Sequence, residues 1–350
     1  GMRLRTADGR LYLDGGPGDS LHASIDDRLE WELLAQAPLP LTGRAAGRFA
    51  GTTIEASARV DSFDVRVISA MLRTDVVTFT AGTASGQLAV AGPFNDPEIT
   101  GVLQLVDGGL RFRYSPDAVG PITGAFSFTG HEFSAGPLTV AVGGAWATAT
   151  VGFTLDHWVP VSFRLDAATA RESAIRTAAT FGRVIVDGRA TGRVRVAAGE
   201  RRTDVTGSVT MNEARITLGE WVDVPFVPEE PPTFVSMATV TGKRVEFFWP
   251  SESYPVVRAT AAAGGRLAIT YRGDTGAYTV NGGADMHGGE IFFFDRSFVM
   301  KEGSIAFKED QRSFDPRITA RAETREWDPA SGEEVKIWLD VDDNLNGLSP

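Results

Sequence analysis

The sequence contains no cysteine, so neither a disulfide bond nor a thiolate metal site can form. It also contains no apolar run of about 18 residues, the length that a membrane-spanning helix needs. No G-x-S-x-G elbow, no phosphate-binding G-x-x-x-x-G-K-[ST] loop and no H-E-x-x-H helix motif occurs. We therefore expect no catalytic residue, no cofactor and no required metal, and we expect that the protein is not an enzyme.

Histidine is scarce as well. The chain has four, which lie far apart in the sequence: His22, His131, His157 and His287. Metal and catalytic motifs bring histidines together at short, fixed spacings. Surface or turn positions are therefore the favoured interpretation of all four.

One acidic run near the end of the sequence partly matches a calcium loop. Asp340, Asp342 and Asn344 stand at the first three ligand spacings. Leu345 replaces the glycine of the sharp turn, and the sequence ends before the distal glutamate. The run favours the solvated end of a strand over a calcium site.

Negative charge predominates over positive charge. The 350 residues carry 45 acidic and 34 basic side chains, for a formal net charge of −11. Such a chain repels the phosphate backbone, so we expect no nucleic-acid partner. With 43% apolar and 23% charged residues, the composition is that of a folded protein.

Apolar and polar residues alternate along much of the sequence. Leu103 and Leu105 flank Gln104, and Leu110 and Phe112 flank Arg111. Successive side chains of a strand point to opposite faces, so this pattern predicts a long sheet with one apolar face. Such a face must be buried by folding the sheet over itself or by holding an apolar ligand.

A loose repeat of about 30 residues recurs at 82–112, 188–218 and 262–307. Each copy predicts a strand, a turn, a second strand, a tight turn and a third strand. Repeats of this size are typical of stacked architectures in which each unit contacts mainly its neighbours.

Two segments depart from the alternation. Alanine-rich residues at helical spacing predict one amphipathic helix near 167–181, ending at Gly182. This helix would pack on a sheet edge or, as the alternative, cover an apolar groove as a lid. The second segment, Ile291–Phe294, is apolar at every position, so we expect it to be covered on both faces or to face lipid-like matter.

The C-terminal half resembles the C-terminal domain of the TamB family. The run Gly288 to Phe307 matches the pattern G-x-I-x-φ-x-x-x-x-F-x-φ-x-x-G-x-I-x-F, and Asp315 to Ala322 matches P-x-φ-x-φ-x-A. The repeats at 82–155 and 188–218 resemble the wider AsmA-like group. The resemblance covers most of residues 82–342, and the family-specific part is about 184–342.

The resemblance implies a mainly β fold: a long, curled, antiparallel-rich sheet that forms an open hydrophobic groove, often called a β-taco. It implies a protein of the diderm periplasm, anchored in the inner membrane, that carries phospholipids to the outer membrane. It also implies support for outer-membrane protein assembly and autotransporter secretion with a BamA-like (TamA-type) barrel partner. It implies no catalytic residue.

We expect residues 1–350 to be one continuous piece of a longer protein, with the one candidate break at 166–182. The Gly1-Met2 start looks like an expression scar, so the membrane anchor of the full protein would be absent from this piece. A carbohydrate-binding or carbohydrate-active β-solenoid, and a structural scaffold that docks an outer-membrane barrel, are the competing functions.

The shared parity of apolar residues within each strand predicts the side chains that line the groove and contact an acyl chain. They are Leu103, Leu105, Leu110, Phe112, Phe126, Phe128, Leu267, Ile269, Ile291, Phe293, Phe298, Met300, Ile305 and Phe307.

Overall fold

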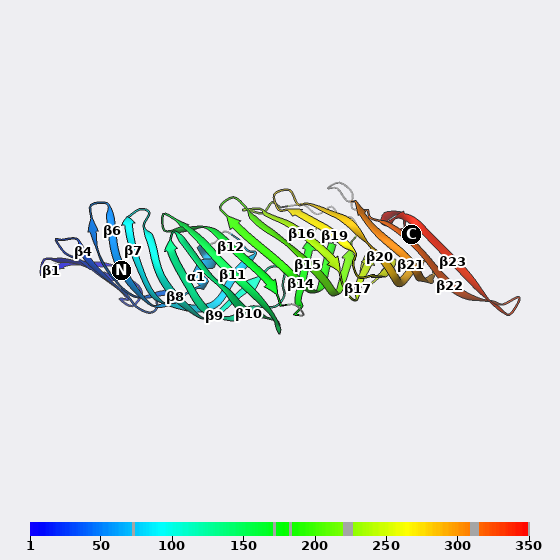
Figure 1. Ribbon diagram of the computed structural model, residues 1–350, viewed down its shortest axis with the longest axis horizontal. Coiled ribbons are helices and arrows are strands. Elements are labelled where there is room, and N and C mark those ends of the chain that lie inside the picture. The colour runs from blue at the N-terminus through cyan, green and yellow to red at the C-terminus, as the bar shows by residue number, and fades with distance from the viewer. Residues whose placement is uncertain (72–73, 171–172, 182–183, 220–226, 309–314, 349–350) are drawn as a thin grey trace. The chain divides into compact units, whose positions relative to one another are not determined.

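The computed structural model describes residues 1–71, 74–170, 173–181, 184–219, 227–308 and 315–348. Almost all of its regular structure is strand, and the 23 strands belong to one hydrogen-bonded sheet (Figure 1). Among the described residues, the helical elements are α1 (Arg66–Met71) and the 3-10 helix η1 (Leu345–Leu348). The predicted mainly β, antiparallel-rich fold is confirmed.

The chain divides into two compact units. Unit 1 comprises residues 1–113, 117–167 and 196–200, and unit 2 comprises residues 114–116, 168–195 and 201–350. The continuity of residues 1–350 as a single groove stays a prediction.

Twelve of the described strands begin before the segment predicted as a helix, and from β1 to β11 each strand pairs antiparallel with the next. They are β1 (Arg3–Ala7), β2 (Arg10–Gly15), β3 (Leu21–Ile25), β4 (Glu30–Ala35), β5 (Leu41–Ala50), β6 (Thr53–Asp64), β7 (Val77–Pro93), β8 (Glu98–Phe112), β9 (Val119–Gly130), β10 (Glu132–Val142), β11 (Ala145–Asp156) and β12 (Val159–Thr169).

The remaining strands begin with β13, which lies inside the segment predicted as a helix. They are β13 (Ile175–Phe181), β14 (Val184–Gly199), β15 (Thr203–Leu218), β16 (Thr233–Thr241), β17 (Val245–Trp249), β18 (Val257–Ala261), β19 (Arg266–Arg272), β20 (Ala277–Phe293), β21 (Arg296–Lys308), β22 (Arg317–Asp328) and β23 (Glu333–Asn344).

The sheet curls within unit 1. Three strands separate β7 from β11, so in a flat sheet their side chains would lie roughly 19 Å apart at about 4.8 Å per strand. The ring centroids of Phe79 on β7 and Phe153 on β11 are only 6.4 Å apart. The apolar face therefore lies on the inside of a curled sheet.

Unit 2 curls in the same way. Strands β18 and β20 separate β17 from β21, which would place side chains roughly 14 Å apart in a flat sheet. The ring centroids of Phe247 on β17 and Phe307 on β21 are 6.2 Å apart. Each unit thus buries its own apolar face.

Unit 2 also contains the parallel pairs of the described sheet. The N-terminal part of β15 pairs in parallel with β16, and its C-terminal part pairs in parallel with β17. Strands β16 and β17 therefore lie end to end beside β15, and β19 and β18 lie end to end beside them. Thr233 at the start of β16 therefore pairs with Thr203 at the start of β15.

The predicted tight turns are wrong in the repeats at 82–112 and 188–218, whereas the repeat at 262–307 has its turn at 294–295 between β20 and β21. Residues 98–112 and 203–218 are each one continuous strand, β8 and β15. Asp107 and Glu213 have φ values of 53° and 48° inside these strands. A left-handed residue inserted in a strand produces a bulge that shifts the alternation by one position. This shift explains why Leu105 and Leu110 are buried on the same face despite their different parity.

The predicted helix near 167–181 is also wrong. Strand β12 extends to Thr169, and Ile175–Phe181 is strand β13. Every residue of β13 pairs antiparallel with β14, and the Ala178 N–H donates to the Tyr114 carbonyl oxygen at 3.2 Å. The ladder with β14 and this further backbone hydrogen bond outweigh the helix propensity of alanine. Arg171, Glu172 and Gly182 lie outside the described residues.

A short helix occurs where the sequence analysis placed none. Asp64 Oδ1 accepts the Arg66 N–H at 3.0 Å at the start of α1. On the helix, Ser69 Oγ accepts the Phe79 N–H of β7 at 2.7 Å. The first contact caps the start of α1, and the second docks the helix against β7, beside the buried Val65.

Candidate functional site

The predicted lining residues lie on the two inner faces, one in each unit. In unit 1 the buried members are Leu103, Leu105, Leu110 and Phe126, and the half-buried members are Phe112 and Phe128. In unit 2 the buried members are Leu267, Ile269, Ile291, Phe298, Met300, Ile305 and Phe307. Phe293 is different, because 41% of it is exposed. That these residues line a lipid path stays a prediction.

A chain of phenylalanine rings occupies the inner face of unit 1. Phe133 stacks on Phe126 with centroids 5.3 Å apart and meets Phe128 edge-on at 4.8 Å. It also contacts Phe153 at 5.0 Å, and Phe153 contacts Phe163 at 5.1 Å. The sequence analysis did not include Phe133, Phe153 or Phe163 among the lining residues. The alternation around Phe153, between Val151 and Leu155, is the signal that could have identified it.

The inner face of unit 2 is built by cross-strand pairs of apolar residues. Ile305 on β21 lies between Ala284 of β20 and Ile318 of β22. Phe298 pairs with Ile291, and both are buried. Such pairs stabilise a sheet by roughly 0.2–1 kcal/mol each.

The expectation for Ile291–Phe294 is only partly met. Ile291 is buried, but Phe292 and Phe293 are more than a third exposed and Phe294 is 86% exposed. The segment that is covered on both faces is instead Phe247–Trp249 of β17, whose residues are all buried. The β20–β21 hairpin therefore presents exposed aromatic rings at its tip.

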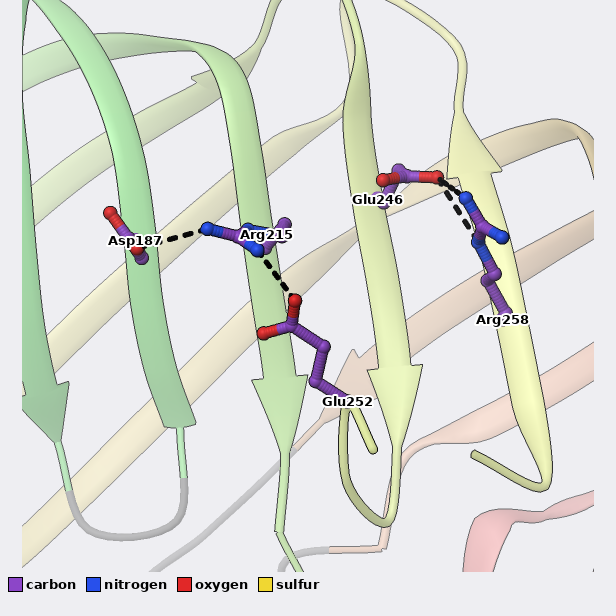
Figure 2. A network of polar contacts seen from close by, with 5 residues as sticks. All are labelled: Asp187, Arg215, Glu246, Glu252 and Arg258. Carbon is purple, nitrogen blue, oxygen red and sulfur yellow. Dashed lines mark hydrogen bonds and ion pairs between the residues drawn. The ribbon is translucent and has the colours of Figure 1, made fainter. Parts of the chain in front are cut away.

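The outer face of unit 2 carries cross-strand ion pairs (Figure 2). Arg215 of β15 lies between Asp187 of β14 at 3.3 Å and Glu252 at 2.6 Å. The hydrogen bond that Arg215 donates to Glu252 is the main cause that raises the pKa of Arg215 above its ordinary value. Charge is thus concentrated on the face opposite the apolar interior.

A second pair explains how an outer-face aromatic ring is covered. Arg258 of β18 donates from Nε and Nη2 to Glu246 Oε1 of β17 at 3.2 and 2.8 Å (Figure 2). Its guanidinium carbon lies 5.8 Å from the centroid of the Phe248 ring. The ion pair holds the guanidinium over the aromatic face, where the cation and the ring attract each other.

The interior offers little acid–base chemistry. Among the described residues, the buried polar side chains are Ser20, Ser115, Thr203, Thr233, Thr239, Thr241 and Glu323. Glu323 Oε1 lies 2.8 Å from Lys301 Nζ, and this hydrogen bond lowers the pKa of Glu323. An interior of aliphatic and aromatic groups with scattered hydroxyls suits an apolar ligand better than a reaction.

A pocket opens in unit 1 beside α1. Its floor includes Phe163, the last ring of the phenylalanine chain, which is 2% exposed. Its rim includes Met71 and Val159, both about half exposed. The full lining is Met71, Val159, Pro160, Val161, Ser162, Phe163, Ala198, Gly199 and Glu200. Phe163 thus belongs both to this pocket and to the phenylalanine chain of the inner face.

The structure brings together two histidines that are isolated in the sequence. The turns that contain Asp96, His131 and His157 meet at one edge of unit 1, where Asp96, Asp156 and His157 could jointly hold a metal ion. The sequence analysis missed this group because Asp96 lies about 60 residues from Asp156 and His157 in the sequence.

The partial calcium pattern lies along β23. Asp340 pairs with Arg321 at 3.5 Å, and Asp342 pairs with Arg317 at 2.8 Å. These carboxylates lie on an extended strand and face arginines of β22. The interpretation as a strand end agrees with this placement.

Two further findings bear on function. Among the described residues, no helix is both long and apolar enough to cross a membrane. A family model described as the TamB C-terminal domain matches residues 141–350. No curated protein and no solved structure matches the sequence.

Proposed function

The chain belongs to the TamB family of bacterial envelope transport and assembly modules, and from this premise we propose that it is a segment of a bridge for phospholipids. The bridge would be anchored in the inner membrane, cross the periplasm and deliver lipids to the outer membrane. It would also support outer-membrane protein assembly and autotransporter secretion beside a BamA-like barrel.

The separation of apolar inner faces from charged outer faces is the observation that carries this proposal. Transfer of each acyl CH₂ group from water to an apolar surface is worth about 0.8 kcal/mol. Even a short stretch of lipid chain against the phenylalanine rings of unit 1 would therefore be held. The lining residues predicted from the sequence are the proposed contacts.

Entry of a lipid chain requires the inner-face side chains of each unit to move. The side chains of the inner faces are buried against one another, with exposed fractions of 2–9% at the buried lining positions. A lipid chain must therefore separate these side chains. The pocket beside α1, with Phe163 at its floor, is the proposed entry point in unit 1.

A docking scaffold is the second candidate. Ile337 and Leu339 of β23 are half-buried, and among the described residues β23 pairs with β22. A strand edge of this kind can be extended by a strand of another protein. Photo-crosslinkers at Ile337 and Leu339 should then capture an outer-membrane barrel or the continuation of the chain. The antiparallel hairpins argue against the β-solenoid alternative, which requires parallel coils.

The proposed transport role is tested by placing a charge on the inner face. Phe112→Asp puts a carboxylate at a half-buried inner position, where it can still reach water, so folding should survive. Passing an acyl chain over an unpaired carboxylate is costly. The control is Val102→Asp on the same strand, because Val102 is 43% exposed on the outer face.

In the full-length protein, we expect Phe112→Asp to fail to restore outer-membrane integrity to a deletion strain and Val102→Asp to restore it. Equal rescue by both variants, at equal protein levels, would show that the inner face of unit 1 is not the lipid path.

A further inference from the structure

Three hairpin turns of unit 1 converge on the Asp96 carboxylate. They are the β7–β8 turn with Asp96, the β9–β10 turn with His131, and the β11–β12 turn with His157 and Trp158. Asp96 Oδ1 accepts the backbone N–H of His157 at 3.2 Å and lies 3.5 Å from His131 Nδ1. Trp158 Nε1 donates to the Phe94 carbonyl oxygen at 2.8 Å. These contacts tie turns that are about 60 residues apart in the sequence.

The partners of these carboxylates differ from those elsewhere in the sheet. Most cross-strand carboxylates face arginine, as Asp187 and Glu246 do (Figure 2). Within the described residues, Asp96 pairs with His131, and Asp156 Oδ1 lies 2.6 Å from His157 Nδ1. An imidazole, unlike a guanidinium, can release its proton and coordinate a metal.

The β11–β12 turn holds an unusual backbone conformation. His157 and Trp158 have φ values of 48° and 69°, a left-handed pair that hairpins usually build from asparagine and glycine. The Trp158–Phe94 and His157–Asp96 hydrogen bonds keep the turn in this form. The His157 side chain is thereby fixed beside both carboxylates.

We propose that Asp96, Asp156 and His157 bind a divalent transition-metal ion, and that the ion ties the hairpin ends of unit 1 together. One ligand atom from each residue lies within 4.8 Å of the others. A tetrahedral zinc centre places its ligand atoms roughly 3.4 Å apart, so small side-chain rotations suffice. The metal replaces the Asp156–His157 hydrogen bond, since coordination requires the unprotonated nitrogen. His131 positions the Asp96 carboxylate from the other side.

The donor set selects the metal. Carboxylate and imidazole together suit zinc and the neighbouring first-row ions, whereas calcium and magnesium prefer an all-oxygen shell. We therefore expect zinc to bind in the presence of excess calcium or magnesium. This site departs from the expectation that the histidines serve only surface or turn positions.

The test uses the untagged chain after treatment with a chelator. Calorimetric titration measures the binding of Zn²⁺, and thermal melting with and without Zn²⁺ measures its effect on stability. His157→Asn suits the left-handed turn, and Asp96→Asn keeps an acceptor for the His157 N–H, so both variants should fold. The control is His22→Asn. His22 Nδ1 lies 2.8 Å from Asp14, but Arg5 shares that carboxylate.

We expect one Zn²⁺ per chain and a raised melting temperature for the wild type and His22→Asn. In His157→Asn and Asp96→Asn the Kd should rise at least about tenfold and the shift in melting temperature should disappear. Binding well below one ion per chain, or an unchanged Kd in His157→Asn and Asp96→Asn, would overturn the proposal. Equal weakening in His22→Asn would overturn it as well.

Discussion

Two adjacent glycines of β20 show what single residues contribute to the curl. A Cβ added to Gly289, where φ is 136°, would lie 2.1 Å from the Arg258 carbonyl oxygen of β18. A Cβ added to Gly288 would meet nothing within 4 Å. Close approach of β18 to β20 thus depends on one glycine and not on its neighbour.

We predict that Gly289→Ala lowers the free energy of unfolding by about 2 kcal/mol or more, because both the φ and the contact are incompatible with a side chain. Gly288→Ala should leave it within about 0.5 kcal/mol of the wild type. Urea denaturation measures both. Similar losses for the two variants would show that the close approach of the strands is not what requires Gly289.

The Glu323–Lys301 contact gives a pH dependence. The Lys301 hydrogen bond lowers the pKa of Glu323, so the ionised carboxylate stabilises the folded state above its unfolded pKa. This stability is lost as the pH falls through the lowered pKa of the folded state. Lys301→Met should reduce the drop in melting temperature that accompanies a fall in pH, whereas Lys243→Met should leave this drop unchanged. Melting curves between pH 3 and pH 7 check this, and identical acid profiles in Lys301→Met and wild type would contradict it.

At the scale of residues, side-chain alternation predicted many of the buried positions within a strand, although Phe293 is 41% exposed. Leu103, Leu105 and Phe126 are buried because side-chain alternation is a local property of the strand. It did not predict Phe133 or Phe163, because their contacts depend on how strands several positions apart approach each other as the sheet curls. The Asp96–His157 group was missed for the same reason.

At the scale of elements, β13 shows how backbone pairing overrides local propensity. Ala178 is exposed on this strand, and its N–H donates to Tyr114. We predict that Ala178→Thr raises the free energy of unfolding, by up to about 1 kcal/mol, because β-branched residues favour strands. If this segment were a helix, the same substitution would lower the free energy of unfolding by roughly 0.5 kcal/mol. Chemical denaturation gives the sign, and a clear loss of stability would contradict the strand.

The errors at the element scale share one cause. The helix near 167–181 and the tight turns at Asp107 and Glu213 were inferred from short windows of sequence. A seven-residue strand such as β13 is decided by its neighbours, since its hydrogen bonds lie outside the window. A bulge and a tight turn use the same residue types, so local composition does not separate them.

At the scale of the whole chain, the family and the mainly β architecture followed from the sequence. The Gly288–Phe307 motif gave the TamB resemblance, and the family model covers residues 141–350. The exchange of segments 114–116 and 196–200 between the two compact units and the parallel return of the chain to β15 did not follow. Both depend on contacts between segments that are distant in sequence.

If the inner faces contact lipid and the outer faces do not, neighbouring residues of one strand should differ in their contact with lipid. Phe298 and Val299 are neighbours on β21, but Phe298 is 6% exposed and points inward, whereas Val299 is 48% exposed on the outer face. A photo-crosslinking phenylalanine analogue at each position, in the full-length protein in living cells, tests this difference directly. We predict phospholipid adducts by mass spectrometry at position 298 and none at position 299. Adducts at both positions in equal yield, or at neither, would contradict the account.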